Sequence, residues 1–104
     1  MVQNKIIDIN DLVMFRELIE YKSKTYLNEA ENKSQVAYLF AHINLSLAIL
    51  LIQMKKDMKI INMYISSAKK YLDISLQNNP FSIDTRMLYS YFLAVLNSDG
   101  RFNK

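Results

Sequence analysis

Hydrophobic and polar residues follow the 3.6-residue period of an α-helix over most of this chain. The clearest example covers residues 59–78, where one side of the predicted helix is apolar and the other polar. Its predicted inward positions are Ile61, Tyr64, Ile65, Ala68, Leu72 and Leu76. Comparable patterns predict three further helices, so that the four span about 11–30, 34–54, 59–78 and 82–97.

The segment 34–54 is the most apolar part of the chain and its longest stretch without a charged residue. A stretch of this length passes the length test for a membrane-spanning helix. However, Asn44 lies in its middle, and a polar line runs along the opposite side of the helix. That line is formed by Gln35, His42, Ser46 and Gln53. We therefore expect a helix packed by neighbours on most sides, with membrane anchoring by this segment as the alternative.

Residues that start and stop helices support these boundaries. Ser34, Asp57 and Ser82 stand at the starts of three helices and are good N-cap residues. Pro80 ends the third helix, because proline disfavours helical geometry in the residue before it. Gly100 is expected to close the last helix with a positive φ. The connections are short, so neighbouring helices should run antiparallel.

The composition points to one all-α domain. The 104 residues are 51% hydrophobic but include only one Gly and one Pro, which suits long helices with short connections. The chain has no Cys, which excludes a disulfide framework or a thiolate metal site and is compatible with the cytoplasm. The net charge of +3 comes from scattered residues, so weak nucleic-acid binding is only a second alternative.

Few residues suggest catalysis or metal binding. His42 is the only histidine, and no acidic residue lies three or four positions from it, so we expect a half-buried structural side chain. Glu17 and Glu20 lie on the charged side of the first helix and are expected to be solvated. The sequence has no glycine-rich phosphate loop or nucleophile motif. It therefore predicts a protein that is not an enzyme and that uses no metal or cofactor.

The third predicted helix resembles the second helix of a tetratricopeptide repeat (TPR). Small Ala68, bulky Leu72, small Ser75 and Pro80, within AKKYLDISLQNNP, carry the resemblance. Small residues let a neighbouring helix approach closely, and the proline ends the hairpin. The next helix, followed by SDGRF, is similar to the first helix and turn of a following repeat. The resemblance covers about 59–102, but the helix lengths depart from the family period of about 34 residues.

The resemblance implies four antiparallel helices arranged as two stacked helical hairpins, with a plain four-helix bundle as the alternative. It also implies that the first helices of the hairpins line a concave surface that holds a peptide or a partner helix. By position, this surface would include Gln35, His42, Ser46, Gln53, Arg86, Tyr89 and Leu93. The carboxylate-clamp residues of the family have no counterpart in this chain.

Aromatic and methionine residues suggest that some apolar surface remains for a partner. The chain has seven Tyr, five Phe and six Met. Tyr21, Tyr38, Tyr71 and Tyr89 lie outside the predicted inward positions. We therefore expect a cytoplasmic adaptor or chaperone that binds a partner helix or a second copy of itself. Small proteins similar to it also serve as chaperones or adaptors of bacterial secretion systems.

Overall fold

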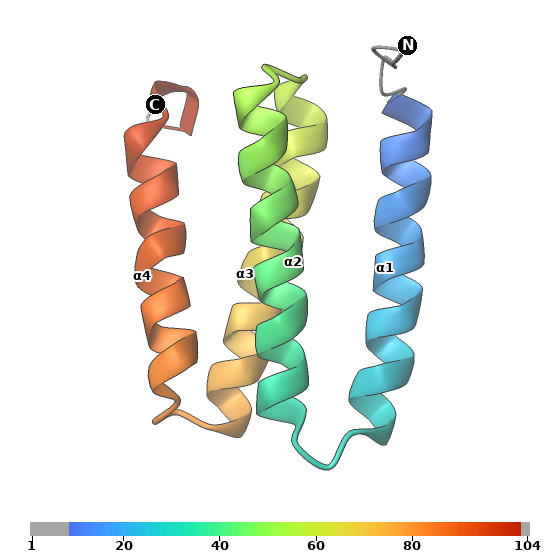
Figure 1. Ribbon diagram of the computed structural model, residues 1–104, viewed down its shortest axis with the longest axis vertical. Helices are drawn as coiled ribbons and strands as arrows, with labels where there is room; N and C mark the ends of the chain where they lie inside the picture. The colour runs from blue at the N-terminus through green and yellow to red at the C-terminus, as the bar shows by residue number, and fades with distance from the viewer. Residues whose placement is uncertain (1–8, 103–104) are drawn as a thin grey trace, which may run out of the picture.

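The computed structural model describes residues 9–102, which form four α-helices and one short 3₁₀ helix (Figure 1). The elements are α1 (Ile9–Glu29), α2 (Lys33–Gln53), α3 (Met58–Asn78), α4 (Ile83–Ser98) and η1 (Gly100–Phe102). No strand occurs within the described residues. The fold is all-α, as predicted, and each helix boundary lies within two residues of its predicted position.

Local hydrogen bonds fix the starts of α3 and α4 as predicted. The carboxylate of Asp57 accepts a hydrogen bond from the backbone N–H of Lys59 at 2.9 Å. The hydroxyl of Ser82 accepts one from the backbone N–H of Thr85 at 3.2 Å. These side chains satisfy N–H groups that have no partner within the helix. Pro80 lies in the turn between the two helices, after α3 has ended.

The start of α2 differs from the prediction. Its N-cap is Asn32, whose side-chain oxygen accepts a hydrogen bond from the N–H of Gln35 at 3.0 Å. The prediction that Ser34 caps this helix is wrong. Ser34 is buried inside the first turn, and its hydroxyl donates a hydrogen bond to the Ser75 carbonyl oxygen at 2.9 Å. Contact with α3 therefore determines the role of this serine.

The end of α4 also differs from the prediction. Gly100 does not have a positive φ, so the predicted glycine C-cap is wrong. Asp99 follows the helix in an extended conformation, and Gly100 begins η1. The side chain of Asp99 then accepts hydrogen bonds from the backbone and the guanidinium group of Arg101. These contacts turn the chain without a left-handed residue.

The left-handed conformation occurs instead at Lys55, where φ is 57°, just after the end of α2. The N–H groups of Lys55 and Lys56 donate to the carbonyl oxygens of Ile52 and Leu51, each at 3.0 Å. These two bonds form a Schellman motif, a helix ending that usually contains glycine at the position of Lys55. The predicted turn between the second and third helices is confirmed.

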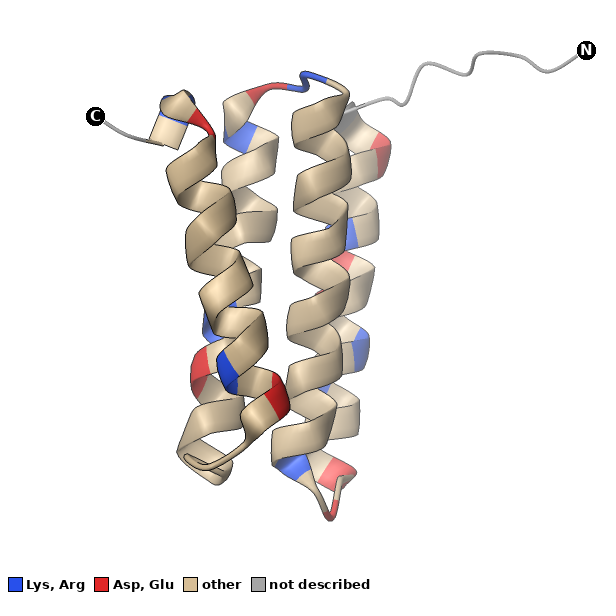
Figure 2. Cartoon of the chain, turned by 60° about the vertical axis from the view of Figure 1, so that its left-hand side comes forward, with Lys and Arg blue, Asp and Glu red and all other residues tan. Residues whose placement is uncertain are grey.

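The helices run alternately in opposite directions and form two layers (Figure 1). Each helix packs against the next helix and the next but one, and α2 and α3 are the closest pair. Among the described residues, α1 and α4 contact this central pair from opposite sides but do not contact each other. Figure 2 shows α2 and α4 side by side in front of α1 and α3. The fold is therefore an open two-layer stack.

Small side chains allow the close approach of α2 and α3. Ala37, Ala41 and Ala48 of α2 are fully buried, as are Ala68 and Ser75 of α3. With little side-chain volume between the helices, their backbones can lie closer than two leucine-rich helices could. The bulky Leu72 is also fully buried between these small residues of α3.

The outer helices are less buried than their patterns predict. Helical spacing places Phe15 and Tyr26 on the apolar side of α1 with the buried Leu12 and Ile19, but they are 46% and 53% exposed. In α4, Ile83 and Met87 are 72% and 66% exposed. Among the described α-helices, each outer helix contacts only the central pair, so these neighbours cover a narrower arc than its apolar residues occupy. The excess apolar residues therefore lie on the surface.

Candidate interaction surfaces

The outer surface of the α2/α4 layer carries almost no charge. Lys33 is the only charged residue of α2, and Asp84 and Arg86 are the only ones of α4. By contrast, α1 has seven charged residues and α3 has four. In Figure 2 these three helix charges lie at the lower end of the layer. At the other end, Asp99 directly follows α4 and forms an ion pair with Arg101 at 3.0 Å. We call the exposed surface between these two ends the uncharged face; it consists of Gln35, His42, Ser46, Gln53, Met87, Tyr91, Ala94 and Ser98.

The predicted polar line of the central helix forms the α2 half of this face. All four of its residues are exposed. Nδ1 of His42 lies 3.4 Å from Oγ of Ser46, and the imidazole ring meets the Tyr38 ring edge-on at 6.2 Å. The prediction of a half-buried His42 is wrong, because the side chain points to the exposed side of α2. Gln53 also reaches α4, where it lines a shallow pocket of about 350 Å³ with Tyr91.

The predicted partner-binding residues of α4 lie elsewhere. Arg86, Tyr89 and Leu93 line one pocket of about 430 Å³ on the side of α4 that faces α3. Within it, Nε of Arg86 donates a hydrogen bond to the carbonyl oxygen of Pro80 at 2.9 Å. Gln53 of the polar line lines a different pocket, together with Tyr91. At 100° per residue, Tyr89 and Leu93 project from the opposite edge of α4 to Tyr91.

A strongly apolar groove of about 590 Å³ runs between α1 and α2. We call it the α1/α2 groove; it is lined by Tyr26, Glu29, Ala30, Val36, Leu39, Phe40 and Ile43. The rings of Tyr26 and Phe40 stack with their centroids 6.2 Å apart. Leu39 is 50% exposed, and the same side of α2 continues to Leu50. Nothing in the sequence pattern singled out this groove except the apolar spacing along α2.

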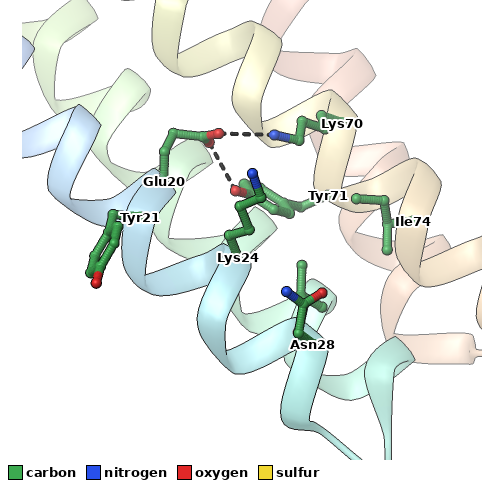
Figure 3. Close-up of a pocket in the computed structure, with 8 residues that line it drawn as sticks. Glu20, Tyr21, Lys24, Asn28, Lys70, Tyr71 and Ile74 are labelled. Atoms are coloured by element: carbon green, nitrogen blue, oxygen red, sulfur yellow. Dashed lines mark hydrogen bonds and ion pairs between the residues drawn. The ribbon is translucent and has the colours of Figure 1, made fainter.

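The α1/α3 layer contains a polar cluster instead (Figure 3). The Glu20 carboxylate accepts hydrogen bonds from Nζ of Lys70 and from the hydroxyl of Tyr71, each at 2.8 Å. Nζ of Lys70 also lies 5.0 Å from the centre of the Tyr71 ring. With Lys24 and Asn28, these residues line a pocket of about 530 Å³. The prediction that Glu20 is simply solvated is therefore wrong.

This cluster shifts the pKa values of its members. Burial raises the pKa of Glu20, but the hydrogen bonds from Lys70 and Tyr71 and the nearby positive charges outweigh burial, so its pKa is below the usual value. The hydrogen bond to Glu20 raises the pKa of Lys70. Burial is the largest cause of a raised pKa at Tyr71. The cluster therefore favours a charged, already neutralised ion pair over a free acid or base.

Further polar contacts join α1 to α3. The Arg16 guanidinium donates to the Met63 carbonyl oxygen at 3.2 Å and to Oγ of Ser67 at 2.9 Å. The buried Tyr64 hydroxyl donates to the Leu12 carbonyl oxygen at 3.0 Å. The available sequence signal was the four-residue spacing of Arg16 and Glu20, which places both on one side of the first helix. Their partners lie about fifty residues away, so the sequence could not identify them.

The four tyrosines predicted to leave surface for a partner have different environments. Tyr71 is only 2% exposed, so its predicted role at the surface is wrong. Tyr38 and Tyr89 are half-buried. Tyr21 is 68% exposed and points away from α3 in Figure 3.

The spread of acidic side chains bears on metal binding, and the length of α2 bears on membrane insertion. Residues 9–102 contain no group of three or more His, Cys, Asp or Glu side chains that could hold a metal ion. In the same range, α2 is the one helix long and apolar enough to cross a membrane, and 33% of its most apolar window is buried. Asn44 of this helix is fully buried; its Nδ2 donates to the Phe40 carbonyl oxygen at 2.8 Å.

The chain was compared with known protein families, curated proteins and solved structures. The chain matches no protein-family model, and no curated protein or solved structure shows significant similarity to it.

Proposed function

We propose that this protein is a non-enzymatic interaction module, an adaptor or chaperone in the cytoplasm that binds an apolar helix of a partner protein. The α1/α2 groove is the observation that carries this proposal. It is lined almost entirely by apolar side chains, and Tyr26, Leu39 and Ile43 remain about half exposed at its edge. A partner helix with apolar residues three and four positions apart would cover these side chains.

The size of the apolar surface supports this role. From Leu39 to Leu50, the exposed apolar residues of α2 extend over about 17 Å, or three helical turns. Covering the exposed half of one such side chain would contribute on the order of 1 kcal/mol. Several such side chains acting together suit a reversible contact that excludes water from the groove.

The arrangement of the helices supports the TPR-like interpretation. Each helix contacts the next two helices, as in stacked hairpins, and α1 and α4 stay apart. The parallel helices α2 and α4 share one layer, which is the position that the first helices of successive hairpins would take (Figure 2). Open stacks of this kind commonly bind other proteins along their surfaces.

Affinity purification of the protein from its own cells tests the proposal. Leu39→Glu places a charge in the groove at a half-exposed position, and Ser66→Glu places the same charge on the exposed side of α3. We expect a stoichiometric partner with the wild type and with Ser66→Glu, and its loss with Leu39→Glu. Helical circular dichroism should be unchanged in all three. A wild type that retains no partner, or equal retention by both variants, would contradict the proposal.

Membrane anchoring by the central segment is the second candidate. It is favoured by the low burial of α2 in its most apolar window and by the lack of charge beyond Lys33. Cell fractionation separates the two candidates. The interaction module should stay in the supernatant after high-speed centrifugation. A protein that sediments with membranes and is released only by detergent would support the anchor.

A further inference from the structure

The uncharged face lies on the α4 side of α2, separate from the α1/α2 groove, and the proposed function leaves it unused. Its α2 half is polar but uncharged, and its α4 half combines the 53%-exposed Tyr91 and 66%-exposed Met87 with the smaller Ala94 and Ser98. Most charged residues of the helices lie in the other layer. This distribution suits a surface that meets another uncharged surface.

We propose that a second copy of this chain docks on the uncharged face, related to the first by a two-fold axis that makes the paired helices antiparallel. The same face on both copies satisfies the symmetry of a closed dimer. Lys33 and Asp84 lie at one end of the layer, and Arg86 lies at the same end on the α3 side of α4. The antiparallel arrangement places this end opposite the other end of the second copy, where Asp99 is already paired with Arg101. A parallel pair would bring the like charges of the two copies together.

The area of the face is close to what one partner contributes to a dimer. α2 has 21 residues and is therefore about 31 Å long. Two helices side by side are about 20 Å wide, which gives roughly 600 Å² in projection. The accessible surface of the side chains exceeds this projection, and a stable complex needs about 800 Å² from each partner. The face is therefore close to the size of one half of a standard interface.

The antiparallel arrangement predicts which residues meet. With the two-fold axis across the middle of the layer, the midpoint of α2 faces the midpoint of α2 in the second copy, and the same holds for α4. His42 lies next to the midpoint of α2. Ser46 and Ala94 lie about one turn from the midpoints of α2 and α4. A negative charge at either position would lie close to the same charge of the second copy, or would be buried against an uncharged surface.

Sedimentation of the purified chain over the micromolar concentration range tests this proposal. We expect a concentration-dependent dimer for the wild type and for the control Ser66→Glu. Ser46→Glu and Ala94→Glu should each weaken the dimer at least about 100-fold, because like charges at an interface are strongly unfavourable. All three substituted positions are exposed in the monomer, so folding should be unaffected. A tenfold increase in salt should change the wild-type dimer only slightly, since the residues of the face are uncharged and Asp99 at its end is paired with Arg101 of the same copy.

A cross-linking experiment identifies the face directly. Because the chain has no cysteine, a single introduced thiol can form a disulfide only with another copy. With a mild oxidant, His42→Cys should form covalent dimers and Ser66→Cys should not. A wild type that stays monomeric overturns the proposal, as does a dimer that resists both Glu substitutions. Because the groove lies outside this face, loss of partner binding in Leu39→Glu would leave the dimer intact, which distinguishes the two proposals.

Discussion

The two layers of the stack differ in how their helices are joined and in what they show to solvent. In the α1/α3 layer, Arg16 and Glu20 of α1 form hydrogen bonds and an ion pair with α3. In the α2/α4 layer, the contact includes Ile49 and Ile52 on one side and Val95 on the other. The charged side chains of the first layer are used to hold its helices together. The helices of the second layer are held together by apolar side chains without charged ones. Its outer surface therefore stays uncharged along most of its length.

The largest expected difference between the layers is at two tyrosines. Tyr71 of α3 is 2% exposed and its ring lies 5.8 Å from Phe40, whereas Tyr91 of α4 is 53% exposed. Tyr71→Ala should lower the free energy of unfolding by about 3–5 kcal/mol, because it leaves a large cavity. Tyr91→Ala should lower it by about 1 kcal/mol or less. Urea unfolding of the monomer measures both, and equal losses would show that Tyr91 is part of the core.

The buried side of α2 offers a second contrast. Within the described chain, Oδ1 of the fully buried Asn44 has no hydrogen-bond partner. Asn44→Ala removes this buried, unpaired oxygen, which costs the folded state about 1–3 kcal/mol. This gain offsets the packing that the substitution loses. The variant should therefore stay within about 1 kcal/mol of the wild type. Leu45→Ala at the next position should cost about 2–5 kcal/mol. Equal losses in thermal unfolding would reveal a partner for Oδ1.

Acid should weaken the α1/α3 layer through Glu20. Its pKa is lowered in the folded state, so its stabilisation is complete above the unfolded-state value, near 4.5, and is lost as the pH falls through the folded-state value. Glu20→Gln should cost less than about 1 kcal/mol at pH 7, because the ion pair is partly exposed. Glu20→Gln should also remove the loss of stability that protonation of Glu20 causes at low pH. The control Glu17→Gln, at an exposed position of the same helix, should match the wild type in urea midpoints from pH 7 to about pH 3.

The smallest expected effect is at the turn that joins the two layers. Lys55 has a φ of 57°, a conformation that costs a residue with a side chain about 1–2 kcal/mol. Glycine removes this cost but gains freedom in the unfolded chain, worth about 0.5–1 kcal/mol. Lys55→Gly should therefore raise the free energy of unfolding by roughly 0.5 kcal/mol. A loss of stability in chemical unfolding would mean that the lysine side chain contributes more than its backbone costs.

The sequence predicted the elements of the fold well because their signals are local. The periodicity of 59–78 matches a helix covered by neighbours along its whole length, and nine of its residues are buried. Asp57 and Ser82 cap their helices through backbone N–H groups two and three residues away. Predictions failed where a distant contact decided the outcome. Ser34 has the chemistry of a cap, but it bonds to a residue 41 positions along the chain.

The candidate surfaces were less predictable for the same reason. The polar line of α2 was visible from helical spacing and lies on an exposed face. Arg86, Tyr89 and Leu93 were grouped with it, but the rotation of α4 about its own axis turns them toward α3. That rotation depends on which residues of α4 meet the central pair. The pairing of Glu20 with Lys70 likewise depends on the position of α1 along α3.

The absence of contact between α1 and α4 affects how the molecule opens. Of the described α-helices, each outer one contacts only the central pair, so either outer helix can detach while the other stays in place. Separation of α2 from α3, by contrast, removes the support of the whole fold. Amide hydrogens should therefore exchange with deuterium in two independent early steps, one for each outer helix, before those of the central pair.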